Sequence, residues 1–172
     1  MIDRLTFITN KIVSIEQAKL QCEGWRMKGE KLVFTNGCFD ILHHGHVFYL
    51  AEAAHLGNRL IVGLNSDGSV RGLNKSPERP INTQDSRSFV LASLGMVDLV
   101  VIFDEQTPRE LIENLVPDVL VKGGDYDASQ EDENNPSYIV GSKIVKQNGG
   151  SVRTIPLKEG FSTTNIISKL RD

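Results

Sequence analysis

The sequence predicts an α/β fold: a doubly wound, five-stranded parallel sheet in three layers, preceded by an N-terminal helix. Short apolar segments alternate with helix-like segments along most of the chain. Such alternation requires parallel pairing through right-handed crossovers, which places helices on both faces of the sheet. Polar, glycine-rich segments also follow the apolar ones, as expected at the carboxyl ends of the strands of a Rossmann-like sheet.

The chain is predicted to form a single domain over residues 1–172, because 172 residues with 40% apolar content are enough for one hydrophobic core. Residues 1–30 supply the N-terminal packing helix. Ser14 and Gln17 have the spacing of a capping box, and the helix is expected to end near Lys28 and Gly29.

Five apolar segments predict the strands, at Lys31–Thr35, Arg59–Leu64, Leu99–Phe103, Val119–Lys122 and Val152–Ile155. Helices are predicted between them, near residues 44–55, 84–94, from Thr107 onward, and from 135–136 to 149–150. For the third helix, Thr107 is expected at the N-cap and Pro108 at the first helical position. The last is bounded by Asn135-Pro136 and Gly149-Gly150.

Composition narrows the possible partners and the compartment. The formal charge of −3 lacks the basic footprint of a general nucleic-acid binder, so a small molecule is the expected partner. Only two cysteines occur, Cys22 and Cys38, and the start of the chain does not resemble a signal peptide, which predicts a reduced, cytoplasmic protein. No apolar run approaches the roughly 18 residues that span a bilayer, so no membrane partner is expected.

The most informative segment is residues 36–46, Asn-Gly-Cys-Phe-Asp-Ile-Leu-His-His-Gly-His. His43 and His46 would share one face at a helix N-terminus, where free N–H groups and the helix dipole favour an anion. Gly37 and Gly45 lack a Cβ, so the backbone can come close to a ligand, and two imidazoles can donate to phosphate oxygens. This segment predicts a nucleotide site.

Three further polar segments follow predicted strands, at 65–67, 122–125 and 159–164, and all four should meet in one crevice. Within the last, Ser162, Thr163 and Thr164 precede a helical pattern; they either cap that helix or hold a second phosphate. Lys122 ends an apolar strand and should reach the crevice. The segments 71–79 and 126–135 read as solvated loops or as lids over the site.

Some of these residues also fit other interpretations. Cys38 and the three histidines of the motif invite a zinc site, but adjacent histidines point in different directions and no further cluster completes a tetrahedral set, so no metal ligand is assigned. Asp40 is as well explained by accepting backbone N–H bonds in a turn as by contacting a ligand. Patterns for P-loops, dinucleotide binding and the hydrolase nucleophile elbow are absent from the sequence.

These residues resemble the His-x-Gly-His nucleotidyltransferases and, among them, the heptose 1-phosphate adenylyltransferases. The resemblance covers nearly the whole chain and is carried by residues 34–46, 63–67, 79–82, 117–126 and 162–167. It implies transfer of AMP from ATP to D-glycero-β-D-manno-heptose 1-phosphate, giving ADP-heptose, a lipopolysaccharide precursor, and pyrophosphate. Mg²⁺ would be held mainly through phosphates, and related proteins are often homodimers.

The resemblance also implies residue roles. His43, His46 and Lys75 would be catalytic. Nucleotide binding would involve Thr35, Asn36, Gly37, Phe39, Gly45, Gly124, Asp125, Ser162, Thr163 and Thr164. Substrate binding would involve Asp40, Asp67, Arg79 and Lys122. The chain departs from the family in a loop one residue longer around Asn74-Lys75 and in a longer 128–137 segment.

Two alternatives stay open. A glycerol-3-phosphate-type cytidylyltransferase is the nearer one, although its Arg-Thr-x-Gly signature is replaced here by Leu157-Lys158-Glu159-Gly160. The other is a nucleotide-sensing module that binds ATP without catalysis; the intact histidines and the Ser-Thr-Thr run argue against it. An aminoacyl-tRNA synthetase shares the histidine motif, but 172 residues leave no room for tRNA-binding domains.

Overall fold

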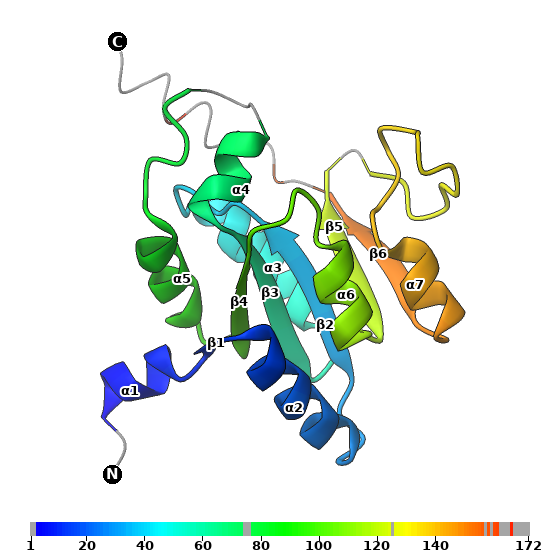
Figure 1. Ribbon diagram of the computed structural model, residues 1–172, viewed down its shortest axis with the longest axis horizontal. Helices are drawn as coiled ribbons and strands as arrows, with labels where there is room; N and C mark the ends of the chain where they lie inside the picture. Colours follow the sequence, from blue (N-terminus) through cyan, green and yellow to red (C-terminus); the bar gives the residue numbers. More distant parts are fainter. Residues whose placement is uncertain are drawn as a thin grey trace.

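The computed structural model describes residues 3–73, 77–124, 126–156, 158, 160, 161 and 166. Its centre is a parallel sheet in the order β1-β4-β3-β2-β5-β6 (Figure 1). The strands are β1 (Ile12–Val13), β2 (Leu32–Gly37), β3 (Arg59–Asn65), β4 (Leu99–Phe103), β5 (Val119–Gly123) and β6 (Ser151–Ile155). The five pairs of neighbouring strands in this sheet are all parallel, which confirms the predicted fold class.

The predicted strand number is wrong by one. The extra strand, β1, pairs Ile12 with Val100 and Val13 with Val101 at the edge of the sheet. Two residues cannot show a strand periodicity, so only pairing with β4 makes this segment a strand.

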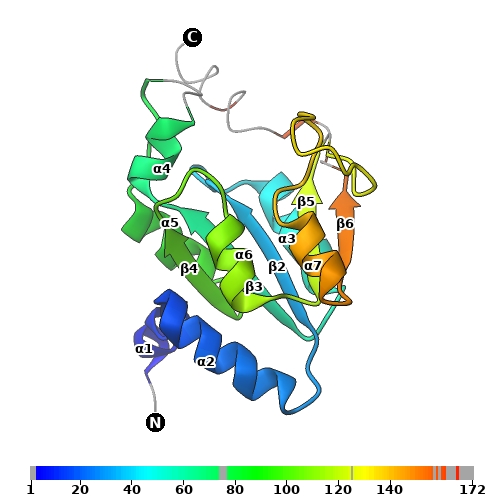
Figure 2. The same cartoon turned by 45° about the vertical axis from the view of Figure 1, so that its right-hand side comes forward.

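Helices cover both faces of the sheet, as the turned view makes clear (Figure 2). Helices α3 (His44–Ala54) and α5 (Gln84–Ala92) pack on one face, with α1 (Arg4–Thr9) against α5. Helices α2 (Ile15–Arg26), α6 (Arg109–Leu115) and α7 (Ser142–Gln147) cover the other. The short α4 (Asp67–Gly72) follows β3. Within the described residues, no helix is both long and apolar enough to cross a bilayer.

Helix starts were predicted with mixed success. The capping box of α2 is present, with Ser14 accepting from the Gln17 N–H and Gln17 accepting from the Ser14 N–H. For α6 the prediction is wrong by one residue: Pro108 is the N-cap, because its carbonyl accepts the first helical hydrogen bond, from Ile112. The helices α1 and α4 have six residues each and were not predicted.

The predicted start of α7 near Asn135 is also wrong, since the helix begins only at Ser142. Asn135 and Ser137 form a side-chain turn, and Gly141 has a left-handed φ of 89° at the N-cap. The helix therefore occupies only the end of the predicted range, and 126–141 forms a long connection after β5.

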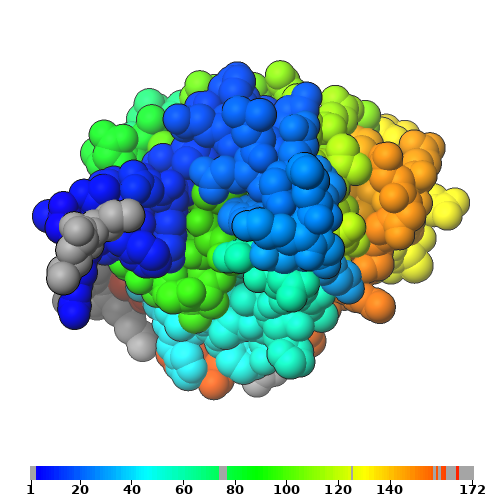
Figure 3. Space-filling model, turned by 90° about the horizontal axis from the view of Figure 1, so that it is seen from below, coloured from blue at the N-terminus to red at the C-terminus, as the bar shows by residue number. Residues whose placement is uncertain are grey.

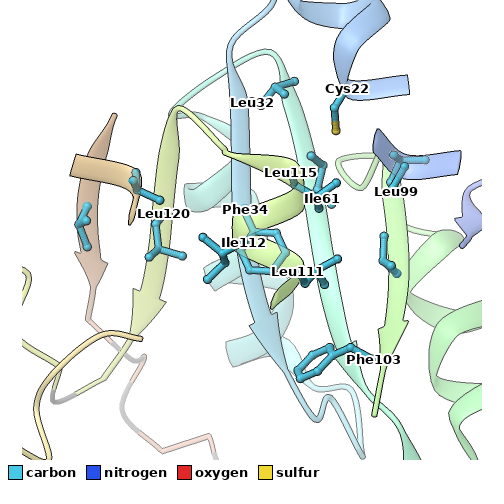
Figure 4. Close-up of a cluster of buried hydrophobic side chains, with 14 of the residues drawn as sticks. Cys22, Leu32, Phe34, Ile61, Leu99, Phe103, Leu111, Ile112, Leu115 and Leu120 are labelled. Atoms are coloured by element: carbon cyan, nitrogen blue, oxygen red, sulfur yellow. The ribbon is translucent and has the colours of Figure 1, made fainter. Parts of the chain in front are cut away.

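The core has two layers because successive strand residues face opposite sides of the sheet. Phe34 packs with Ile112 and Leu120 between the sheet and α6 (Figure 4). Val33 and Val62 belong to the cluster under α3 and α5. Burial of the sheet on both faces is typical of parallel sheets and explains their continuous apolar strands.

The direction of winding reverses between β2 and β5. Strands β3 and β4 extend from β2 to one side, and β5 and β6 to the other. Ligands of such sheets bind at this switch point, outside the carboxyl ends of the strands. The opposite end of the molecule, where α1 and α2 form much of the surface, is seen in Figure 3.

Gly24, in the last turn of α2, provides a test of the helix assignment. A Cβ built there meets no atom within 4 Å. Since alanine favours a helix interior over glycine, Gly24→Ala should raise the free energy of unfolding by about 0.5–1 kcal/mol in urea titrations. The matched change Gly63→Ala should lower it, because its Cβ would lie 2.8 Å from the Phe34 ring. A destabilised Gly24→Ala protein would contradict the assignment.

Candidate functional site

A cavity of about 730 Å³ opens at the switch point. This volume is within the range of small-molecule sites. Nine of the residues selected from the sequence line it: Asn36, Gly37, Phe39, Asp40, His43, Gly45, His46, Arg79 and Lys122. Segments that follow β2 and β5 thus meet at one crevice, as their positions after strand ends predict.

The two histidines form a stacked pair in this cavity. His43 is the N-cap of α3 and His46 lies in its first turn; their ring centroids are 3.8 Å apart and the planes differ by 22°. The Nδ1 atoms of both rings are buried and have no hydrogen-bond partner among the described residues. Buried polar atoms usually have partners, so this pair is a candidate for a functional rather than a purely structural role.

Burial favours the neutral form of both rings in the ligand-free protein. It lowers the pKa of His46 to about 4, with smaller contributions in the same direction from His43 and Arg79. Burial also lowers the pKa of His43. A bound polyanion opposes these shifts, because a nearby negative charge favours the protonated ring.

The low pKa of His46 predicts a pH dependence of stability. In the unfolded chain its pKa is about 6.5, so between pH 6.5 and 4 the unfolded state binds more protons than the native state. The stability that the neutral His46 ring contributes to the native state is therefore complete above about pH 6.5, and it is lost as the pH falls toward 4. We expect His46→Gln to lose less unfolding free energy than the wild type between pH 7 and pH 5, measured in urea without ligand. Equal losses would contradict this assignment.

Close contacts around the motif explain its glycines. A Cβ on Gly45 would lie 3.1 Å from the His43 ring and 3.0 Å from Cβ of Phe161. A Cβ on Gly37 would lie 3.0 Å from the Phe39 ring, and Phe39 itself has a left-handed φ of 43°. The motif therefore folds tightly over the end of β2, which fixes where the imidazoles lie.

Lys122 extends from the end of β5 into the crevice. Its Nζ donates to Oδ1 of Asn36 at 2.7 Å and lies 5.4 Å from the Tyr126 ring centroid. The two adjacent strands β2 and β5 thus each contribute a polar side chain at the point where the winding reverses. This arrangement leaves an ammonium group on the cavity surface near the histidine-bearing loop.

Asp40 holds two loops together. Its side chain is buried and accepts from the N–H groups of Ile81 (2.8 Å) and Asn82 (3.0 Å) and from Nε of Arg79 (3.1 Å). These bonds favour the turn-stabilising interpretation over direct contact with a ligand, although Asp40 also borders the cavity. Arg79 is positioned at the cavity by this ion pair.

Arg87 is the most important residue that the sequence interpretation missed. It lies on α5 with a side chain only 1% exposed. Its guanidinium donates to the carbonyls of Cys38 (2.7 Å), Asn65 (2.8 Å) and Asn82 (3.0 Å) and to Oδ1 of Asp67 (2.7 Å). It therefore joins the loops after β2 and β3 to the 79–82 loop. An arginine in an amphipathic helix gives no signal that it is buried.

Three other selected residues, Thr35, Asp67 and Gly124, do not line the cavity. Thr35 is buried beneath it and shares a 2.6 Å hydrogen bond with the Tyr49 hydroxyl. Asp67 is paired with Arg87, and the N–H of Gly124 donates to the Ile155 carbonyl. Lys75, Asp125, Ser162, Thr163 and Thr164 lie outside the described residues. The cavity is also lined by 106–108, Pro136 and Tyr138, which were not predicted, and by Tyr126 and 133–135, which belong to the segment predicted as a solvated loop or a lid.

Comparison with known proteins identifies the family. The sequence profile described as cytidylyltransferase-like matches residues 34–169, which include the histidine pair and every strand that borders the cavity. The chain belongs to the cytidylyltransferase-like family. The resemblance to nucleotidyltransferases stated from the sequence is thus confirmed at the level of the family.

Curated relatives of this cytidylyltransferase-like chain carry the name "Bifunctional protein HldE". That of Aeromonas salmonicida is 52% identical over 161 residues, which are 94% of this chain and 32% of the relative. The protein of Pseudomonas aeruginosa strain UCBPP-PA14 is 54% identical over 160 residues, which are 93% of this chain and 32% of the relative. The chain spans about a third of the length of the curated relatives it matches.

Two solved structures share the fold of the cytidylyltransferase-like domain. The lipopolysaccharide core biosynthesis protein of Thermoplasma volcanium is 26% identical, with a TM-score of 0.56 over 76% of this chain and 98% of that chain. The pantoate-beta-alanine ligase of Francisella tularensis, solved with beta-gamma ATP and beta-alanine, has a TM-score of 0.59. The match covers 93% of this chain and 76% of the ligase chain. At 15% identity the ligase shows the fold alone.

Proposed function

We propose that this chain transfers AMP from ATP to D-glycero-β-D-manno-heptose 1-phosphate, giving ADP-heptose and pyrophosphate for lipopolysaccharide synthesis. The observation that carries the proposal is the stacked pair of His43 and His46, with unpartnered Nδ1 atoms, in a cavity at the switch point. Membership of the cytidylyltransferase-like family, the identity to HldE proteins and the Thermoplasma structure support this reaction class and this acceptor.

The reaction forms one bond and breaks one. An oxygen of the sugar phosphate attacks the α-phosphorus of ATP, and the bond between this phosphorus and the oxygen bridging to the β-phosphorus breaks, releasing pyrophosphate. The attacking oxygen is already anionic at neutral pH, so no general base is required. Positioning and preorganised donors supply most of the rate in such chemistry.

The proposed roles follow from position. His43 and His46 donate hydrogen bonds to the α-phosphate as it becomes five-coordinate, and Lys122 adds positive charge at the end of β5. Lys75 is assigned to the transition state and Ser162–Thr164 to the outer phosphates on the strength of the resemblance. Asp125 is assigned to the ribose on the same ground.

Mg²⁺ is proposed to enter with the triphosphate. Within the described residues, no group of three His, Cys, Asp or Glu side chains is placed to hold a metal ion. Asp40 and Asp67 are both engaged by arginines. Because these carboxylates are already paired, we assign Mg²⁺ mainly to the phosphate oxygens of ATP, whose charge the ion neutralises.

Cys22 and Cys38 are both free, consistent with the proposed cytoplasmic location.

Pyrophosphate release tests the proposal. Each of the four nucleoside triphosphates is supplied with either heptose 1-phosphate or glycerol 3-phosphate, and ATP with heptose 1-phosphate is expected to give the highest kcat/KM. Turnover confined to CTP and glycerol 3-phosphate would replace the assignment by a cytidylyltransferase. Binding of ATP without pyrophosphate release from any pair would identify a nucleotide sensor.

A further inference from the structure

The cavity has two chemically different walls. One is formed by the histidine pair and Lys122, which suit an anion. The other, here called the amide wall, is formed by Gln106, Glu133, Asn134 and Asn135. Its residues come from the loops that precede α6 and α7, the helices on the face of the sheet opposite α3. A ligand that fills the cavity therefore contacts both walls.

The carboxylate of the amide wall is paired within the protein. Oε2 of Glu133 lies 3.0 Å from Nη2 of Arg109, and Oε1 lies 3.0 Å from Nζ of Lys143. With the single carboxylate of this wall paired twice, the wall presents hydrogen-bonding groups without a net negative charge. Such a surface suits hydroxyl groups better than cations.

The backbone of this wall is largely used in its own turns. Residues whose N–H groups donate within the loop are Glu131, Asp132, Asn134, Asn135, Ser137 and Tyr138. A nucleotide base is commonly recognised along its edge by backbone N–H and C=O groups, and here the N–H groups of Asn134 and Asn135 are occupied. Nδ2 of Asn134 donates to Oδ1 of Asp132 at 3.3 Å, so the Gln106 amide and Oδ1 of Asn134 are the groups that remain for a ligand among the described residues.

The side chains of Asn135 and Tyr138 also face a ligand at this wall. Oδ1 of Asn135 accepts from the N–H and the hydroxyl of Ser137, at 2.9 and 2.8 Å, which leaves its Nδ2 as the group able to donate to a ligand. Tyr138 is only 6% exposed and also borders the cavity, so it offers an apolar surface beside the amides. Amide donors next to an aromatic ring suit a sugar ring, which has both hydroxyl groups and C–H faces.

We propose that the amide wall binds the hydroxyl groups of the sugar acceptor and determines which sugar 1-phosphate is used. This inference rests on the proposed function. The phosphate of the acceptor then lies toward the histidines and the ring toward Gln106, Asn134 and Asn135. Each amide removed leaves sugar hydroxyls without partners, which costs binding of the sugar and not of the nucleotide.

The test is the double variant Gln106→Ala/Asn134→Ala, whose side chains are exposed in the free protein, so that the fold is kept. Pyrophosphate release is measured while heptose 1-phosphate and ATP are varied separately. The KM for the sugar should rise tenfold or more while the KM for ATP changes less than twofold. The control is Gln147→Ala/Asn148→Ala, two exposed amides at the end of α7 outside the cavity, with both KM values unchanged.

An unchanged KM for the sugar contradicts the inference, and so does an equal rise of both KM values, which would mean that the amide wall holds the nucleotide. These results leave the proposed function standing. Failure of the wild type to use any sugar 1-phosphate, while ATP still binds, overturns the proposed function itself and removes the sugar as the occupant of the amide wall.

Discussion

Replacing His46 by alanine is expected to lower kcat about a hundredfold or more, by analogy with the loss of one preorganised donor to developing charge. The imidazole lies in the first turn of α3, stacked on His43, and its Nδ1 is buried without a partner among the described residues. The measurement is steady-state pyrophosphate release at saturating ATP and sugar phosphate.

The matched control is His55→Ala. His55 is exposed at the C-cap of the same helix, at the end away from the cavity, so kcat should stay within about twofold of the wild type. A His46→Ala protein that folds normally and keeps near-normal turnover would remove the histidine pair from the mechanism.

Replacing Arg87 by methionine should lower the free energy of unfolding by about 3–5 kcal/mol, because it removes one partner of a buried ion pair and leaves carbonyls without donors. The carbonyls of Cys38, Asn65 and Asn82 and the carboxylate of Asp67 all lose their guanidinium partner. Urea unfolding followed by circular dichroism measures the change. The KM for ATP should also rise, since the loop after β2 loses its anchor.

Arg153→Met provides the comparison, because Arg153 is exposed on β6. We expect its effect on stability to stay within about 0.5 kcal/mol. Equal stability of the two variants would show that the Arg87 bonds contribute little to holding the loops.

Local patterns in the sequence predicted the fold class and most of the site. The five long strands are continuous apolar runs because both faces of the sheet are buried, and polar segments after β2 and β5 meet because parallel strands end at one edge. The spacing of His43 and His46 predicted a pair on one face, and the structure stacks them at 3.8 Å.

Features that depend on distant contacts were not predictable. The strand β1 exists only through its pairing with β4. Arg87 is buried only because three loops converge on it. The polar sequence of 126–135 fitted a solvated loop as well as a lid, and the choice depends on distant contacts: Glu133 pairs with Arg109 and Lys143, and the segment borders the cavity.

The central claim is attack at the α-phosphorus of ATP by a sugar phosphate in the cavity between the histidine pair and the amide wall. Its most direct test is to follow phosphorus label from ATP during turnover with heptose 1-phosphate. Label at the α-position should appear in the sugar nucleotide, and label at the γ-position only in pyrophosphate. Transfer of the γ-label to the sugar, with release of ADP, would contradict the account.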